Sequence, residues 1–331
     1  MEIQVVECSP TFELGDEVLL SEVPIILRGL VAHWPIVTQA KCSDTAAVDY
    51  FNSLYGDRPV TIVRGNADIQ GRIGYAPDFS KMNSGLIKKT LPDALGLILG
   101  EDTNENPMLH YIGSTPTGSI MPDFRTHNDI KLGVNANQFI WLGNRSCISA
   151  HYDLPDNIAC NVVGRRRFTL FPPDQLENLY VGPLDFTPAG QSISLVDIRN
   201  PDLSRFPKYA QAQKTALVAE LEPGDALFIP SMWWHHVEGL ERFNVLVNYW
   251  WHQTAGLTSS PADVLDLALL SIRDLPSAQK KAWKNILDHY IFNEDKNAFD
   301  HIPESARGSL GPMTDTVSRK LRAKVLSRLN R

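Results

Sequence analysis

The pattern of apolar and polar positions divides the chain into three zones. Residues 1–105 combine short β-branched runs with a helical spacing, and residues 106–255 hold a series of short apolar runs bounded by Gly and Pro. Residues 256–331 repeat apolar residues every three or four positions. These periodicities predict an N-terminal α/β flank, a β-rich core and a C-terminal helical extension.

Strand patterns dominate the first two zones. In the flank they predict strands at 23–27 and 60–63, with a helix at 44–55 between them. The predicted core strands cover residues 108–112, 138–142, 157–163, 167–171, 226–229 and 244–250. Gly164 and Arg165 separate two of these runs and predict a tight hairpin turn. Many short strands with such punctuation favour a sandwich or a barrel.

Three helices are predicted in the extension. Ser260 followed by Pro261 is typical of a helix N-terminus. A second helix begins near Pro276 and a third near Thr314. Their apolar stripes consist of Trp283, Ile286, Leu287, Tyr290 and Ile291 in the second helix and of Val317, Leu321, Val325 and Leu329 in the third. Because wide apolar stripes are normally covered, we expect them to pack against the core or against a second copy of the chain.

Composition narrows the class of protein. The chain has 331 residues, of which 43% are hydrophobic and 21% charged, and this excludes collagen, a coiled-coil rod and a disordered chain. The net charge of −7 argues against nucleic-acid binding. No apolar run approaches the ~18 residues of a membrane span. The start lacks the pattern of a signal peptide, and the four cysteines are scattered, so we expect a cytoplasmic protein without membrane contact.

His151 and Asp153 are the residues that suggest chemistry. In an extended segment, residues two apart point to the same side, so this pair presents an imidazole and a carboxylate together. His235, followed by His236, lies beside a strand farther along the same zone. Two His and one carboxylate on a rigid β scaffold form the facial triad that holds non-haem Fe(II). A packed, hydrogen-bonded histidine cluster is the alternative interpretation.

Several motifs resemble, in order and spacing, the cupin-like JmjC class of Fe(II)/2-oxoglutarate oxygenases. They are His151-Tyr152-Asp153, Leu170-Phe171-Pro172-Pro173-Asp174-Gln175, Pro223-Gly224-Asp225, Trp233-Trp234-His235-His236 and Val247-Asn248-Tyr249-Trp250. Within that class they are most similar to the asparaginyl hydroxylase that inhibits hypoxia-inducible factor and to bacterial cupin-like proteins. The resemblance covers about residues 20–255. It implies a mainly β fold, the double-stranded β-helix or jelly roll.

The resemblance also implies the metal ligands. His151, Asp153 and His235 match the iron ligands of the class. In the class the first His after the paired Trp is the ligand, which makes His236 a residue that packs behind the site. Fe(II) and O2 are thereby implied as cofactor and oxidant.

Four further residues match positions that hold the cosubstrate 2-oxoglutarate. They are Tyr111, Asn157, Arg166 and Asn248, and His110 is the alternative to Tyr111 because it lies one position away. Arg166 replaces a Lys of the class, and a guanidinium can bind the distal carboxylate of 2-oxoglutarate with two hydrogen bonds.

Two departures bear on the cosubstrate. Ile148 replaces a Thr of the asparaginyl hydroxylase and removes a hydroxyl from the expected contacts, while the change from Lys to Arg166 can compensate. If Arg166 does not hold the carboxylate, Arg145 and Arg242 are the next candidates.

The resemblance implies a dioxygenase that hydroxylates a polypeptide side chain or a small molecule and converts 2-oxoglutarate to succinate. The alternatives are N-methyl-lysine demethylation, a metal-binding cupin with isomerase-like chemistry, and a non-catalytic interaction module. The related asparaginyl hydroxylase dimerises through its terminal helices, so we expect a homodimer through residues 256–331. No motif names the substrate, and we expect loops such as 121–135 to form the pocket walls.

Overall fold

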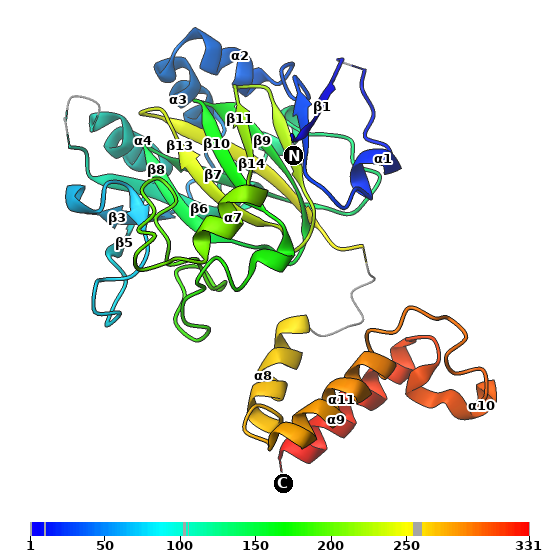
Figure 1. Ribbon diagram of the computed structural model, residues 1–331. Helices are drawn as coiled ribbons and strands as arrows, with labels where there is room; N and C mark the ends of the chain where they lie inside the picture. Colours follow the sequence, from blue (N-terminus) through cyan, green and yellow to red (C-terminus); the bar gives the residue numbers. More distant parts are fainter. Residues whose placement is uncertain (1, 10, 102–103, 105, 254–259, 331) are drawn as a thin grey trace. The chain divides into compact units, whose positions relative to one another are not determined.

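The computed structural model of the chain describes residues 2–9, 11–101, 104, 106–253 and 260–330 (Figure 1). It separates into two units, Met1–Trp251 and His252–Arg331, and each is described here by itself. Strands that precede residue 105 hydrogen-bond into the same sheet as the predicted core strands, so flank and core share one unit.

The larger unit contains two β-sheets. The nine-stranded sheet has the order β1-β2-β12-β9-β14-β7-β6-β3-β5 and the five-stranded sheet the order β11-β10-β13-β8-β4. The strands of the first sheet are β1 (Gln4–Glu7), β2 (Ile25–Arg28), β3 (Val60–Gly65), β5 (Ser84–Lys89), β6 (Leu109–Pro116), β7 (Asn137–Gly143), β9 (Asp156–Val163), β12 (Ala226–Ile229) and β14 (Asn244–Trp251). Those of the second are β4 (Arg72–Ile73), β8 (Ser146–His151), β10 (Arg166–Phe171), β11 (Leu217–Leu221) and β13 (Trp234–Gly239).

Eight strands wind back and forth between the two sheets. Strands β7, β9, β12 and β14 lie side by side in the first sheet, and β8, β10, β11 and β13 lie side by side in the second. Along the chain the strands from β7 to β10 and from β11 to β14 alternate between the sheets. This winding is that of the double-stranded β-helix, and the predicted fold class is confirmed.

The predicted hairpin at Gly164 and Arg165 is wrong. β9 and β10, which these residues join, lie in different sheets and do not pair with each other. The chain instead turns a corner, and Gly164 adopts a positive φ of 70° there. A β-carbon on Gly164 would lie 2.7 Å from Asn244 Oδ1 and closer still to the carbonyl oxygen of Phe243, so glycine is required at this corner.

The alternation of side chains along each strand separates two environments. In β9, Ile158 and Cys160 join the apolar cluster that contains residues of the covering helices, whereas Ala159 joins the cluster shared with the five-stranded sheet. The longer helices that contribute to the first cluster are α2 (Pro35–Cys42), α3 (Asp44–Ser53) and α4 (Leu91–Gly100). Helix α7 (Tyr209–Thr215) packs with Phe171 and Trp234 in a third cluster. The short helices of this unit are α1 (Asp16–Leu19), α5 (Thr117–Ile120), α6 (Phe124–His127) and the 3₁₀ turns Ala67–Ile69 and Pro173–Gln175.

The smaller unit is helical, as the periodicity predicts. It contains α8 (Pro261–Ser271), α9 (Ser277–Tyr290), α10 (Glu304–Arg307), a 3₁₀ turn (Gly308–Leu310) and α11 (Asp315–Leu329). The Ser260 hydroxyl accepts from Ala262 N and the Thr314 hydroxyl from Val317 N, so both helices begin at a capping residue. Within residues 260–330 no apolar side chain is buried. Across the described residues, no helix has the length and apolarity needed to cross a membrane.

Candidate metal centre

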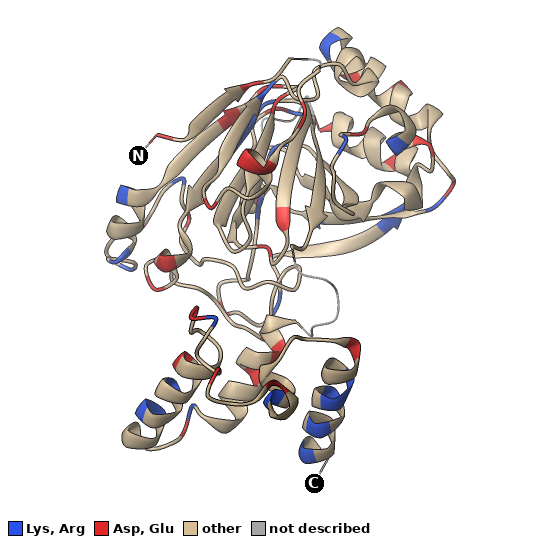
Figure 2. Cartoon of the chain, turned by 90° about the vertical axis from the view of Figure 1, so that its right-hand side faces the viewer, with Lys and Arg blue, Asp and Glu red and all other residues tan. Residues whose placement is uncertain are grey.

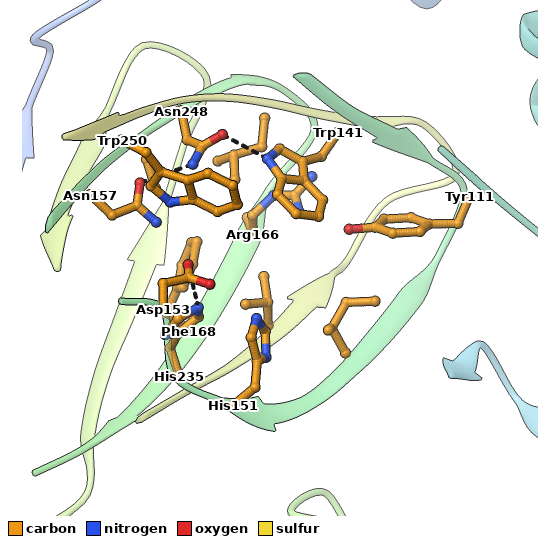
Figure 3. A pocket seen from close by; sticks show the side chains of 14 residues that line it. Tyr111, Trp141, His151, Asp153, Asn157, Arg166, Phe168, His235, Asn248 and Trp250 are labelled. Carbon is orange, nitrogen blue, oxygen red and sulfur yellow. Dashed lines mark hydrogen bonds and ion pairs between the residues drawn. The ribbon is translucent and has the colours of Figure 1, made fainter. Parts of the chain in front are cut away.

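Strands β8 and β13 bring the two candidate histidines together. These strands pair antiparallel, with His151 directly opposite His235, and the two ring centroids lie 4.3 Å apart. Asp153 follows the end of β8 by two residues, and its Oδ2 lies 3.5 Å from His235 Nε2. One ligand atom from each of the three residues falls within 4.8 Å of the others (Figure 3). This is the spacing of donors around a single metal ion.

Backbone carbonyl groups fix which nitrogen of each ring is available. His151 Nδ1 lies 2.9 Å from the Ser149 carbonyl oxygen, and His235 Nδ1 lies 3.0 Å from the Trp233 carbonyl oxygen. Because a carbonyl oxygen only accepts, both Nδ1 atoms carry the proton and donate it. The Nε2 lone pairs are thereby left for a metal, which is how metal-binding histidines are commonly oriented.

Burial keeps the candidate ligand His235 neutral. Loss of solvent, reinforced by the nearby His151, lowers the pKa of His235 to about 4, although the Asp153 carboxylate acts in the opposite direction. The imidazole is therefore uncharged at neutral pH, and the neutral form is the one that binds a metal. Asp153 also accepts a hydrogen bond from Gln191 Nε2 at 3.4 Å.

A small inner cavity of about 50 Å³ connects the triad with Arg166. The Arg166 side chain is 2% exposed, and its guanidinium donates through Nε to Asn161 Oδ1 at 3.4 Å. It forms an ion pair with no carboxylate of the described residues, and burial lowers its pKa to about 10. A buried guanidinium without an anion is costly, so the cavity is suited to an anionic ligand.

One indole and two amide side chains form a series of hydrogen bonds along another wall of the inner cavity. Trp141 Nε1 donates to Asn248 Oδ1 at 2.8 Å, and Asn248 Nδ2 donates to Asn157 Oδ1 at 3.2 Å. Asn157 and Asn248 are both buried and both line the inner cavity (Figure 3). These bonds fix the orientation of the two amides before any ligand arrives.

Comparison with known proteins assigns this arrangement to a family. Residues 10–256 match the family described as "Cupin-like domain". The chain belongs to this cupin-like family. The match covers the candidate ligands and all but the first strand of the two sheets, and it ends close to the boundary with the helical unit.

The chain is similar to several proteins whose names differ, and one of them is named for a JmjC domain. It is 25% identical over 238 residues to "Lysine-specific demethylase 8" of Xenopus tropicalis, covering 71% of this chain and 49% of that protein. It is 27% identical over 248 residues to "JmjC domain-containing protein D" of Dictyostelium discoideum, covering 70% and 52%. It is 26% identical over 289 residues to "tRNA wybutosine-synthesizing protein 5" of Mus musculus, covering 76% and 83%. The chain spans about half the length of the first two. The resemblance to the cupin-like JmjC class is confirmed, and the nearer likeness to the asparaginyl hydroxylase stays a prediction.

The structure brings the seven candidate residues of the cupin-like chain to one place. His151, Asp153, His235, Tyr111, Asn157, Arg166 and Asn248 all line the inner cavity. Tyr111, on β6, points its hydroxyl into the cavity toward Arg166, and burial raises its pKa to about 12, so it is a neutral hydrogen-bond donor (Figure 3). His110 is buried but lines neither this cavity nor its larger neighbour.

Other candidates lie elsewhere. His236 is buried on the far side of β13, where its Nε2 lies 3.7 Å from Cys147 Sγ and 3.8 Å from Glu238 Oε1. Arg145 and Arg242 line none of the site, and Arg242 pairs with Asp44 on the surface.

A second, larger cavity of about 390 Å³ shares Tyr111, Trp141, Ile148, His151, Asp153 and Trp250 with the first. Loop residues 188–193 form one of its walls, whereas the 121–135 segment lines neither cavity, so the predicted wall is wrong. Sequence reasoning also missed Trp141, Phe168 and Gln191. Phe168 is two positions from Arg166 and on the same strand face, which is a usable signal, but nothing in the sequence marks Gln191.

Proposed function

We propose that this cupin-like protein is an Fe(II)- and 2-oxoglutarate-dependent dioxygenase that hydroxylates a polypeptide side chain or a small molecule. One observation carries the proposal: three metal donors line the same cavity as a buried guanidinium that has no anionic partner among the described residues. A metal site alone fits many proteins. A metal site that faces a buried guanidinium fits a protein whose cosubstrate is a dicarboxylate, because one carboxylate can bind the metal and the other can pair with the guanidinium.

The donor set fits iron(II). Two neutral imidazoles and one carboxylate are the ligands of the facial triad, in which half of the coordination positions stay open. His151, Asp153 and His235 would hold the ion. Bound iron(II) and 2-oxoglutarate together supply the oxidation, in which O2 is consumed, 2-oxoglutarate becomes succinate and CO2, and the substrate gains a hydroxyl.

The residues of the chain bind and orient the cosubstrate. Arg166 would pair with the distal carboxylate, and the neutral Tyr111 hydroxyl could donate to the same group. The hydrogen bonds from Trp141 through Asn248 to Asn157 hold the amide wall in place. Phe168, Val237 and Leu246 complete the cavity with apolar surface, which excludes water and strengthens the ion pair.

The names of two relatives suggest other reactions and substrates. One is named a lysine-specific demethylase and another a tRNA wybutosine-synthesizing protein, so demethylation and an RNA substrate are alternatives for the same metal site. Neither alternative changes the assignment of the metal ligands or of Arg166.

Oxygen uptake and succinate release, measured together, test the proposal. We expect the purified protein with Fe(II) to convert 2-oxoglutarate to succinate with matching oxygen consumption, and we expect Asp153→Ala to do neither. Arg167→Ala is the matched control, since Arg167 is the half-buried neighbour of Arg166 and pairs with Glu220 outside the cavity. Metal binding without any binding of 2-oxoglutarate would contradict the proposal and favour isomerase-like chemistry. A protein that binds neither would be an interaction module.

A further inference from the structure

The larger cavity lies where a substrate would approach the metal. Three strands from outside the eight-stranded core contribute to it. They are β6, β3, which extends the first sheet beyond β6, and β4, which extends the second sheet beyond β8. Thr61 and Val63 of β3 face the cavity, while Ile62 between them points into the helix-covered cluster. Ile73 of β4 pairs with Ile148 of β8, and both line the cavity.

The walls of this cavity are mostly apolar and uncharged. Beyond the residues shared with the inner cavity, its lining includes the apolar side chains of Val63, Ile73, Pro188, Ala189 and Ile193. The polar side chains there, those of Thr61, Ser114, Ser149 and Gln191, are all uncharged. Among the described residues that line it, only the candidate ligands His151 and Asp153 are imidazole or carboxylate groups, and none is Lys or Arg. Tyr111 is neutral, because burial raises its pKa to about 12. Among the described lining residues, the single carboxylate is therefore that of Asp153, which would bind the metal.

Hydrogen bonds hold the end of the loop wall at Ile193 and Ser194. Ser194 N donates to Ala150 O at 2.7 Å, next to the candidate ligand His151, and Gly182 N donates to Ile193 O at 2.9 Å. Nearer the tip, the Tyr75 hydroxyl donates to Phe186 O at 2.7 Å. These hydrogen bonds hold the loop beside the cavity, so its side chains influence which substrate groups can bind there.

We propose that the group presented to the metal is uncharged and largely aliphatic, rather than a methylated ammonium or a phosphate. This inference rests on the proposed function, because it concerns the substrate of the same metal site, and it is argued from the residues that line the larger cavity. A cation or an anion in this cavity would lose its water and gain no opposite charge from the walls. Trp141 and Trp250 pack edge to face with ring centroids 5.9 Å apart, which covers one of their ring faces. The cation–π attraction of the remaining faces is smaller than the free-energy cost of removing water from a cation that has no carboxylate partner.

Probes of equal shape and different charge test the inference. 3,3-Dimethylbutan-1-ol and choline differ in a single atom, carbon or nitrogen, and 3,3-dimethylbutanoate adds an anion of similar size. We expect ligand-observed NMR on the full chain with Zn(II) and 2-oxoglutarate to show that the alcohol binds tighter than either ion, on the order of tenfold or more. Choline or the anion binding equally well, or no binding of the alcohol, overturns the inference.

A matched pair of variants shows whether charge is the cause. Val63→Asp places a carboxylate in the wall, and Val63→Asn places a neutral group of the same size there. We expect Val63→Asp alone to gain affinity for choline, and an equal gain in both variants contradicts the inference. The alcohol measurement is repeated without Zn(II) and 2-oxoglutarate. If the alcohol still binds while no succinate is formed under any condition, the proposed function fails and the description of the cavity stands.

Discussion

At the scale of single residues, His235 and His236 are neighbours with opposite surroundings. His235 presents Nε2 to the triad, and its Nδ1 is fixed by the Trp233 carbonyl group. His236 is turned the other way, toward Cys147 and Glu238. Strand alternation alone produces this separation, because adjacent residues of β13 point to opposite faces.

We therefore expect His235→Ala to lower metal affinity by about 100-fold or more, because it removes one of three ligands. His236→Ala should retain metal binding, since the His236 ring lies on the other face of β13, beside Cys147 and Glu238. Metal content after dialysis, measured by atomic emission, compares the two variants directly. Loss of metal from His236→Ala with retention by His235→Ala would mean that the neighbouring histidine is the ligand.

Arg166 is the residue on which cosubstrate binding should depend most. Arg166→Ala is expected to weaken 2-oxoglutarate binding by about 2–5 kcal/mol, because the distal carboxylate would enter the cavity without a cation. Arg166→Lys should recover part of the loss. Calorimetric titration with 2-oxoglutarate gives the affinities, and Arg167→Ala supplies the control. An unchanged affinity in Arg166→Ala would show that another residue holds the carboxylate.

At the scale of elements, periodicity predicted the positions of the strands better than it predicted which strands pair with each other. The run at 226–229 coincides with β12, and the other core runs agree with β6, β7, β9, β10 and β14 to within a few residues. The prediction of a hairpin at Gly164 was wrong because a short connection between two strands does not reveal whether the strands pair with each other. Here β9 and β10 enter different sheets. The pocket wall failed for a related reason, since residues 188–193 reach the site through long-range hydrogen bonds that no local pattern encodes.

The site was easier to predict than the walls around it. The spacing of two residues between His151 and Asp153 predicts that both side chains point to the same side of an extended segment. Alternation along the strand likewise places Arg166 on the same face as Phe168. The orientation of Asn157 depends on Asn248 and, through it, on Trp141, residues that are distant in sequence. Such contacts follow from the register of β14 against β7 and β9, which the sequence pattern does not give.

The corner at Gly164 gives a prediction about stability. Gly164→Ala should lower the free energy of unfolding by at least about 1–3 kcal/mol, because alanine resists the positive φ and its β-carbon meets the Phe243 carbonyl and Asn244. The Gly164 carbonyl also accepts from Asn161, the residue that contacts Arg166, so 2-oxoglutarate affinity should fall as well. Urea unfolding measures the first effect. Gly85→Ala in β5 is the control, since open space surrounds that position, and an equal loss there would contradict the explanation.

At the scale of the whole molecule, many apolar side chains are exposed in the described part of the helical unit, residues 260–330. Among its exposed apolar side chains are Leu270 at 78%, Phe292 at 70% and Leu326 at 60% exposure. The predicted stripes are exposed in part. Trp283, Ile286 and Tyr290 of α9 and Val325 and Leu329 of α11 are exposed, whereas Leu287, Val317 and Leu321 are half-buried. Lys and Arg gather along α11 beside this stripe (Figure 2). An apolar stripe bordered by charge is typical of a helix that pairs with another helix.

We expect this surface to form a homodimer, because a two-fold pairing covers the same apolar stripes on both copies at once and is the commonest form of assembly. Light scattering at micromolar concentration should give twice the chain mass of 37.0 kDa. Leu321→Glu combined with Val325→Glu should give a folded monomer, because it places two like charges in each half of the interface. Lys320→Gln with Lys324→Gln, at the same helical spacing on the charged side, should remain dimeric. A wild-type monomer would mean that the stripes pack within one chain, and a dimer that survives the glutamate pair would place the interface elsewhere.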